Sequence, residues 1–147
     1  MLARVISMIC ALSLAACAAF DFPDPTPEDF AIHGIDVARY QGDIDWNRVK
    51  RAGTEFAFIK ATEGGDYLDP KFLENWYAAK AAGVPRGAYH FYYFCRPVED
   101  QIAWFIENVP NDPDALPPVL DMEWNAYSKT CRDRPPRDVV IRDMRKF

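Results

Sequence analysis

The stretch "EFAFIKATEGGDYLDPKFLENWYAAKAAGVPRGAYHFYYF", residues 55–94, decides the fold. It opens with an apolar run that stops at two glycines, which is typical of a buried strand followed by a turn. It closes with an aromatic run that again favours a strand. Between the two runs, apolar side chains recur at helical spacing, with Asp69 as cap, Pro70 in the first turn and Gly83 at the stop. The stretch therefore predicts a strand, a helix and a second strand.

The same alternation continues on both sides of this stretch. Residues 31–40 predict a strand that ends near Asp36, followed by a short helix that Asp45 caps and Gly53 ends. The remaining predicted elements are a helix at 97–109, a strand at 117–124 and a helix at 134–147. Strands that alternate with helices indicate a parallel sheet with right-handed crossovers. The sequence therefore predicts an α/β fold with four strand-helix units.

Composition narrows the class of protein. The chain has 147 residues and is 50% hydrophobic, which is too apolar for a disordered protein and fits one domain. A net charge of -5 gives no electrostatic support to nucleic-acid binding. Two histidines, without a His/Cys cluster, argue against a zinc site, and no glycine-rich nucleotide loop or Ser/His/Asp order is visible. We therefore expect no metal and no cofactor.

The first residues have the pattern of an export signal. Arg4 precedes an apolar run that is too short to span a bilayer, so residues 1–16 are predicted to be a signal peptide. Residues 14–17, "LAAC" from Leu14 to Cys17, resemble the lipobox of bacterial lipoproteins, in which the cysteine is lipidated. Residues 16–18 also fit an ordinary cleavage site, so secretion without a lipid remains open. Both alternatives predict an exported protein, either in the cell envelope, facing the periplasm or cell surface, or secreted. We expect contact with a membrane only if Cys17 carries a lipid.

The exported chain would then consist of a linker and a domain. Residues 17–30 are acidic and proline-rich, which is typical of an extended linker, and the domain is expected at residues 31–147. Export implies an oxidising compartment, so Cys95 and Cys131 are predicted to form a disulfide. Two unpaired buried thiols are the alternative.

Two acids end the strand at 117–124. Asp121 and Glu123 are two positions apart and share a strand face, with their Cβ atoms about 6 to 7 Å apart. Carboxylates at this separation resist double ionisation, so one pKa rises. A carboxylic acid with a raised pKa can protonate a poor leaving group, as glycoside hydrolysis requires. The same pattern also serves metal binding, salt bridges and plain surface positions.

Other polar side chains follow the ends of the other predicted strands. Asp36, Glu63 and His90 would meet the acid pair at one rim, because function in α/β sheets gathers at the carboxyl ends of strands. His90 is interpreted as a hydrogen-bonded structural residue. Aromatic residues that could stack on sugar rings, or simply pack in the core, lie near these ends: Tyr40, Trp46, Tyr67, Tyr89, Phe91, Tyr92, Trp124 and Tyr127.

Three segments together resemble glycoside hydrolase family 25, the bacterial and phage lysozymes. They are "GIDVARYQGDIDWNRVKRAGTEFAFIKATEG" (34–64), "YLDPKFLENWYAAKAAGVPRGAYHFYYF" (67–94) and "PPVLDMEWN" (117–125), in the family's order. The resemblance implies an irregular, TIM-like (β/α) barrel. It also implies hydrolysis of the β-1,4 bond between N-acetylmuramic acid and N-acetylglucosamine in peptidoglycan, which would be the protein's partner.

The resemblance also suggests roles for individual residues. Glu123 matches the general acid/base, and Asp121 matches the carboxylate that assists it by orienting the substrate's 2-acetamido group, with net retention of configuration. Asp36 matches a further acid of the same catalytic site. Residues expected to bind or support the substrate are Tyr89, Tyr40, Trp124, Lys60 and Glu63. For Glu63, simple pairing with Lys60 is an equal alternative.

The sequence departs from the family in length. Four strand-helix units are visible, whereas a barrel closes with about eight strands. The domain at residues 31–147 is therefore expected to be C-terminally incomplete, and only about the first half of the barrel is expected. Either the sequence is a fragment of a longer lysozyme, or a short chain exists that is unstable or inactive unless completed. The alternative function is an inactive peptidoglycan-binding module of the envelope.

Overall fold

The computed structural model describes residue 26 and residues 29–147. The chain divides into two units, residues 1–30 and residues 31–147. The predicted signal peptide, the lipobox with Cys17 and most of the predicted linker lie outside the described residues. In the first unit, the Thr26 backbone N–H donates a hydrogen bond of 2.7 Å to Asp29 Oδ2. The fold and the site belong to the second unit.

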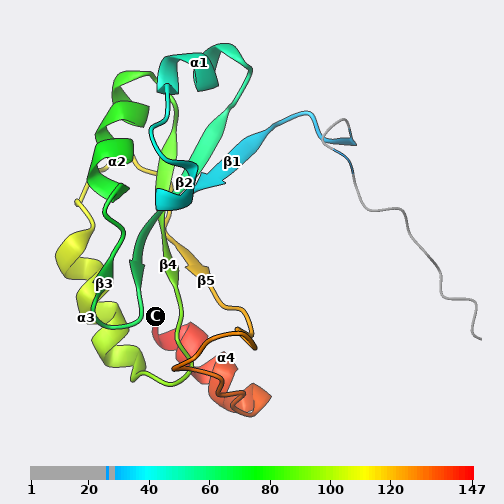
Figure 1. The fold of residues 1–147 in the computed structure, drawn as a ribbon, viewed down its shortest axis with the longest axis vertical. Helices are drawn as coiled ribbons and strands as arrows, with labels where there is room; N and C mark the ends of the chain where they lie inside the picture. The colour runs from blue at the N-terminus through cyan, green and yellow to red at the C-terminus, as the bar shows by residue number, and fades with distance from the viewer. Residues whose placement is uncertain (1–25, 27–28) are drawn as a thin grey trace, which may run out of the picture. The chain divides into compact units, whose positions relative to one another are not determined.

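The second unit is built on a parallel sheet (Figure 1). Its strands lie in the order β1-β2-β4-β5, and all three neighbouring pairs are parallel. A two-residue strand, β3, pairs antiparallel with the end of β2. The strands are β1 (Gly34–Val37), β2 (Phe56–Glu63), β3 (Tyr67–Leu68), β4 (Arg86–Phe91) and β5 (Val119–Asp121). The predicted α/β fold with a parallel sheet is confirmed, whereas β3 is too short to leave a pattern in the sequence.

Helices follow the parallel strands in the predicted order. They are α1 (Trp46–Arg51), α2 (Phe72–Ala81), α3 (Val98–Asn108) and α4 (Arg137–Lys146), with a 3-10 turn, η3 (Arg39–Gln41), after β1. The start of α1 is as predicted, because the Asp45 side chain accepts a hydrogen bond from the Arg48 backbone N–H at 3.0 Å. Gly83 follows the end of α2 with a φ of 69°, a conformation that glycine adopts without strain.

The start of α2 differs from the prediction. Lys71 occupies the N-cap position, and no side chain caps the helix. Asp69 lies two residues earlier: Oδ1 accepts from the Lys71 N–H at 2.9 Å, and Oδ2 accepts from the Arg39 N–H at 3.0 Å. The buried Asp69 carboxylate therefore ties the turn before α2 to the segment after β1, instead of capping the helix.

The core lies between the sheet and the helices α2 and α3, which run along one side of it in Figure 1. Alternate residues of β2 and β4 point to these helices, and Ala57, Ile59 and Ala88 are buried there. From α2, Phe72 and Trp76 pack against them, with ring centroids 5.5 Å apart. Each large side chain buried in this way contributes about 1.5 to 3 kcal/mol to folding. We call this side of the sheet the helix face.

A bulge changes the alternation in the middle of β2. Lys60 pairs with Tyr89 and Thr62 pairs with His90, so that Ala61 is an extra residue without a partner. Ala61 and Thr62 are both fully buried on the helix face. Lys60 and Glu63 consequently lie together on the opposite side, which we call the cleft face. If the same four residues, 60–63, alternated regularly without a bulge, residues 60 and 63 would lie on opposite faces.

His90 is a structural residue of the helix face, as predicted. Gln101 of α3 donates through Nε2 to the carbonyls of Tyr93 (3.0 Å) and Arg96 (3.1 Å), so its Oε1 must be an acceptor. His90 Nε2 therefore donates to Gln101 Oε1 (3.0 Å), and Nδ1 accepts from the Thr62 hydroxyl (2.7 Å). Burial lowers the pKa of His90, which agrees with this neutral tautomer.

Candidate active site

The amino end of the cleft face is a floor of aromatic rings. Phe56 and Phe58 project from β2 and pack edge to face, with ring centroids 5.8 Å apart. Their rings lie across Gly34 of β1 and Gly87 of β4, where an added Cβ would come within 2.2 Å and 2.5 Å of ring carbons. Only glycine allows the rings to lie this close to the neighbouring strands.

Four of the predicted site residues meet above this floor. Asp36 of β1, Tyr89 of β4, Asp121 at the end of β5, and Glu123 line one hollow of about 430 Å³. The parallel register explains the meeting, because Asp36 pairs with Phe58 of β2, and Asp121 lies beside Phe91 of β4. The strand predicted at 117–124 is shorter than expected and ends at Asp121. Glu123 therefore lies two residues beyond the strand, and its side chain is exposed.

The acids of this hollow influence one another. Burial raises the pKa of Asp121, and the charge of Glu123 and a hydrogen bond between the two carboxyl groups raise it further, while Lys60 opposes the shift. Burial also raises the pKa of the Tyr89 hydroxyl, with smaller effects from the charges of Asp36 and Asp121. Burial and the neighbouring Glu123 thus both favour the protonated form of Asp121. The sequence predicted a raised pKa in this pair, and the structure places the increase on Asp121.

A second charged group lies at the end of β2. The Lys60 ammonium group donates to Glu63 Oε2 at 2.5 Å and lies 4.7 Å from the centre of the Phe91 ring. The Tyr93 hydroxyl donates to Glu63 Oε1. Burial alone would raise the pKa of Glu63, but the hydrogen bonds from Lys60 and Tyr93 lower it overall. Glu63 is thus an ionised, paired carboxylate. Tyr93 is not among the site residues predicted from the sequence, although the aromatic run that forms β4 continues through it.

The two exposed aromatic residues that were predicted to bind sugar lie apart from the acid hollow. Tyr40 is 73% exposed, and the Arg39 guanidinium group lies 4.7 Å from its ring centre. The Trp124 ring stacks on Phe94, with centroids 4.4 Å apart and an interplanar angle of 24°. Neither side chain is among those that line the hollow. Trp124 nevertheless follows Glu123, which lines the hollow, directly in the chain.

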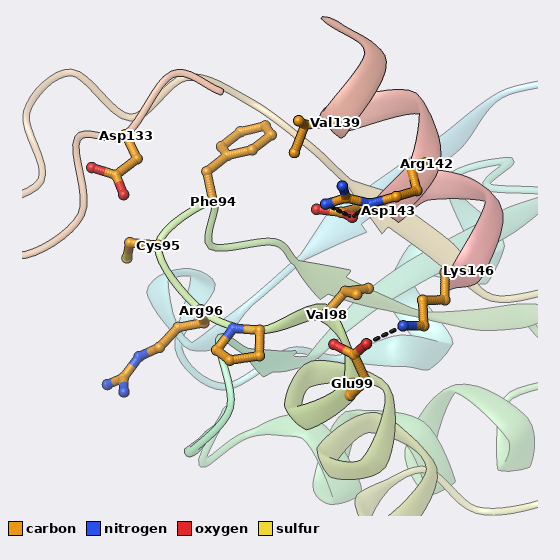
Figure 2. Close-up of a pocket in the computed structure, with 11 residues that line it drawn as sticks. Phe94, Cys95, Arg96, Val98, Glu99, Asp133, Val139, Arg142, Asp143 and Lys146 are labelled. Atoms are coloured by element: carbon orange, nitrogen blue, oxygen red, sulfur yellow. Dashed lines mark hydrogen bonds and ion pairs between the residues drawn. The ribbon is translucent and has the colours of Figure 1, made fainter. Parts of the chain in front are cut away.

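A disulfide joins Cys95 to Cys131, with Cα atoms 5.6 Å apart. It connects the loop between β4 and α3 to the segment between β5 and α4. Beside it lies a second hollow of about 550 Å³, which Figure 2 shows between this loop and α4. Four of its charged side chains pair with each other, Arg142 with Asp143 at 2.9 Å and Lys146 with Glu99, and Arg96 pairs with Asp66 outside the hollow. The charges of this second hollow are therefore largely compensated from within the protein.

Two further properties concern only residue 26 and residues 29–147. In this part of the chain, no group of three or more His, Cys, Asp or Glu side chains is arranged to hold a metal ion. No helix in the same part has the length and apolar character needed to cross a bilayer. In the part of the chain that the structure describes, we therefore take the ionisable side chains of the cleft face as the candidate catalytic groups.

The parallel sheet carries acids at the carboxyl ends of its outer strands, β1 and β5. This arrangement defines the class of protein: a barrel-like α/β protein with a site lined by carboxylates. The sequence profile of one such family, "Glycosyl hydrolases family 25", matches residues 35–147. The chain belongs to this family. The resemblance seen in the sequence is thereby confirmed.

Individual relatives agree with this assignment. Lysozyme M1 of Streptomyces globisporus is 44% identical over 107 residues, which cover 68% of this chain and 35% of the relative. The uncharacterized protein YegX of Escherichia coli K12 is 41% identical over 102 residues, covering 66% of this chain and 38% of YegX. This chain thus spans little more than a third of the length of these curated relatives.

Solved structures give the same result for the fold. A family 25 glycosyl hydrolase from Bacillus anthracis matches with a TM-score of 0.75 and 41% identity, covering 83% of this chain and 55% of that structure. The bacterial lysozyme from Streptomyces coelicolor matches with a TM-score of 0.61 and 44% identity, covering 66% and 46%. The match extends over about half of each solved chain.

Proposed function

We propose that the protein is a lysozyme-type glycosidase that cleaves the β-1,4 bond between N-acetylmuramic acid and N-acetylglucosamine in peptidoglycan. The observation that carries the proposal is the hollow in which Asp121 and Glu123 meet Asp36 and Tyr89. Family membership supports the substrate class, because relatives such as Lysozyme M1 carry that activity in their names. The raised pKa of Asp121 adds that Glu123 lies close enough to influence the protonation of the neighbouring acid.

In the proposed reaction, Glu123 first acts as an acid. Its carboxyl proton moves to the glycosidic oxygen as the bond from that oxygen to C1 of the muramic acid breaks. The carbonyl oxygen of the sugar's own 2-acetamido group bonds to C1 on the opposite face. The Glu123 carboxylate then takes a proton from a water molecule, whose oxygen bonds to C1 and releases the acetamido oxygen. Two inversions give net retention of configuration.

Other residues would assist without exchanging protons with the leaving group. Asp121, next to Glu123, would orient the acetamido group and stabilise the positive charge that it acquires. Asp36 and Tyr89 line the same hollow and would bind the sugar there. Lys60 and Glu63 would support this end of the cleft face through their ion pair, and the exposed rings of Tyr40 and Trp124 would contact sugars farther along the glycan.

The identity of the cleaved bond can be tested directly. Purified peptidoglycan is digested with the protein, the new reducing ends are reduced with borohydride, and the reduced sugars are identified by mass spectrometry. Muramitol is expected, because the proposed bond leaves muramic acid at the reducing end. Glucosaminitol would show that another bond is cleaved, and the absence of both alditols would contradict the proposed hydrolysis.

A peptidoglycan-binding module without turnover is the second candidate function. The observation that favours it is the exposure of Glu123, because catalytic acids commonly work in sites that exclude water. A pull-down on the same cell walls distinguishes the two functions. Binding without new reducing ends supports the module, whereas new reducing ends support the hydrolase.

We also propose that the protein is exported to the cell envelope and lipidated at Cys17. The pattern of residues 1–17 supports export, and a disulfide such as Cys95–Cys131 persists in oxidising compartments. The intact mass of the mature protein tests the proposal. A diacylated or triacylated chain that starts at Cys17 is expected, whereas an unmodified chain that starts at Ala19 would indicate ordinary secretion.

A further inference from the structure

The general acid proposed here is not part of the sheet. The strand β5 ends at Asp121, and residues 122–136 contain no helix or strand. The last hydrogen bond between the β4 and β5 backbones before this segment runs from the Tyr92 N–H to the Asp121 carbonyl at 2.8 Å. Glu123 lies beyond it, so contacts other than the sheet ladder must determine where its carboxyl group is held.

Two contacts tie the segment at 122–136 to the loop between β4 and α3. The ring of Trp124, the residue after Glu123, stacks on Phe94. The neighbour of Phe94, Cys95, forms the disulfide with Cys131, and the Cys95 N–H also donates to Cys131 Sγ at 3.2 Å. Successive residues of the loop, 94 and 95, therefore hold both ends of the stretch from 124 to 131.

The loop that carries these contacts is itself fixed from the protein interior. Buried Gln101 accepts from the Tyr93 N–H at 2.9 Å and donates to the carbonyls of Tyr93 and Arg96. The Tyr93 hydroxyl in turn donates to Glu63 on β2. In Figure 2, Phe94 and Cys95 lie on this loop, close to the start of α3. A continuous set of contacts thus runs from the core of α3 to the segment that carries Glu123.

We propose that Phe94, Trp124 and the Cys95–Cys131 disulfide form a clamp that positions Glu123 over the cleft, so that hydrolysis requires the oxidised chain. The catalytic part of this inference rests on the proposed function. Proton transfer needs the carboxyl group within hydrogen-bond reach of the glycosidic oxygen, and a displacement of about 1 Å can cost about 100-fold in rate. The sugar in the acid hollow would be bound mainly by Asp36 and Tyr89, which lie on strands that the clamp does not hold, whereas Trp124 would contact only sugars farther along the glycan. Opening the clamp should therefore lower kcat much more than it changes KM.

The test compares the full oxidised chain with the chain reduced by dithiothreitol. In the reduction, Cys95 and Cys131 become thiols and dithiothreitol is oxidised to its cyclic disulfide. Hydrogen exchange of residues 122–131 is measured together with kcat and KM on peptidoglycan, at a temperature where circular dichroism shows both forms folded. Exchange in this segment is expected to rise while that of β2 and β4 stays unchanged. A fall in kcat of about 10- to 100-fold is expected, with KM nearly constant and recovery after reoxidation.

Two variants make the test specific. The double variant Cys95→Ser/Cys131→Ser should match the reduced protein and should not respond to dithiothreitol. The variant Phe94→Leu keeps the disulfide but loses the aromatic stack, and a smaller fall in kcat is expected. Because this variant needs no reduction, it keeps the inference testable if the reduced chain does not fold at any temperature.

The failure of this inference can be told apart from the failure of the proposed function. If the oxidised chain does not hydrolyse peptidoglycan, the proposed function fails, and exchange at residues 122–131 still decides whether the clamp exists. Unchanged exchange on reduction overturns the clamp. Unchanged kcat in a folded, reduced and active chain overturns its catalytic role. If reduction unfolds β2 and β4 as well, and Phe94→Leu retains full kcat, the disulfide serves global stability and the inference is also overturned.

Discussion

The helix face and the cleft face belong to the same strands, yet they differ in almost every physical property. On the helix face, Ile59 and Ala88 are buried among rings from α2 and α3, and the polar His90 has partners for both ring nitrogens. On the cleft face, Tyr89 is partly exposed and Asp121 has a raised pKa beside another acid. Residues that are neighbours in one strand thus face a buried, mostly apolar interior on one side and acids that repel each other on the other.

This difference shows how a small sheet can hold an unfavourable site. Burial of apolar surface contributes about 25 cal/mol for each Å², and the helix face supplies most of that burial. Carboxyl groups held close together and partly away from water reduce stability instead. Substitutions on the helix face should therefore change the free energy of unfolding, whereas substitutions of the acids at the cleft should change turnover. The following predictions, ordered by the expected size of the effect, test this division.

The largest effect is expected for Glu123→Gln. Removal of the proposed acid/base should lower turnover about 1,000-fold, because the leaving group then departs without a proton. The temperature of unfolding should stay the same, since Glu123 is exposed and lies outside the sheet. A reducing-end assay on purified peptidoglycan measures the change. Glu107→Gln, at an exposed position of α3, is the matched control, and near-normal turnover of Glu123→Gln would exclude the proposed role.

On the helix face, Phe72→Ala should lower the free energy of unfolding by about 4 kcal/mol, because a fully buried ring is replaced by a cavity. The next residue of the same helix provides the control. Leu73 is 44% exposed, so Leu73→Ala should cost less than about 1 kcal/mol. Urea denaturation measures both variants. Equal losses would mean that α2 does not bury the face that the structure shows.

The floor of the cleft face is expected to show an intermediate effect. In Gly87→Ala the new methyl group would lie 2.5 Å from the Phe58 ring, so the ring must move, at a cost of about 1.5 kcal/mol. Gly65→Ala is the control, because a methyl group there meets Asp100 at an ordinary 3.5 Å. Urea denaturation again provides the measurement. If Gly87→Ala is as stable as the wild type, the rings do not need the close approach.

The smallest effect has the opposite sign. The pKa of Asp121 is raised in the folded protein, so its protonated form is favoured there, and stability is lost as the pH rises through that raised pKa. Asp121→Asn resembles the protonated form and should increase the free energy of unfolding by about 0.5 kcal/mol at pH 7. Near pH 3, below the ordinary pKa of Asp, the gain should vanish. Urea denaturation at both pH values measures this gain. A lower free energy of unfolding for Asp121→Asn at pH 7 would contradict the conclusion that the ionised Asp121 destabilises the folded protein.

Much of the fold follows from local patterns in the sequence. The end of β1 near Asp36, the Asp45 cap of α1 and the stop at Gly83 depend on neighbouring residues, which the sequence displays directly. The meeting of Asp36 with Asp121 follows from one further rule, because parallel strands bring their carboxyl ends to one edge. The order of the helices and strands was sufficient for that inference.

The remaining features depend on contacts between segments that are distant in the chain. The bulge at Ala61 is a mismatch between β2 and β4, and no pattern within β2 indicates it. Gln101 and Tyr93 gain their roles only when α3 packs beneath the loop after β4. The strand β5 begins later than predicted, at Val119, because Pro117 and Pro118 have no N–H to donate to a neighbouring strand.

The bulge in β2 has a consequence for how the family's sequences can vary. Ala61 is the single residue that puts the two halves of the strand out of phase. Loss of this one codon would remove the extra residue and restore simple alternation, with Thr62 still opposite His90 and Glu63 still opposite Phe91, so both side chains would keep their present faces. Sequences of the family can therefore differ by one residue at this point of the strand without separating Lys60 from Glu63 or His90 from Thr62.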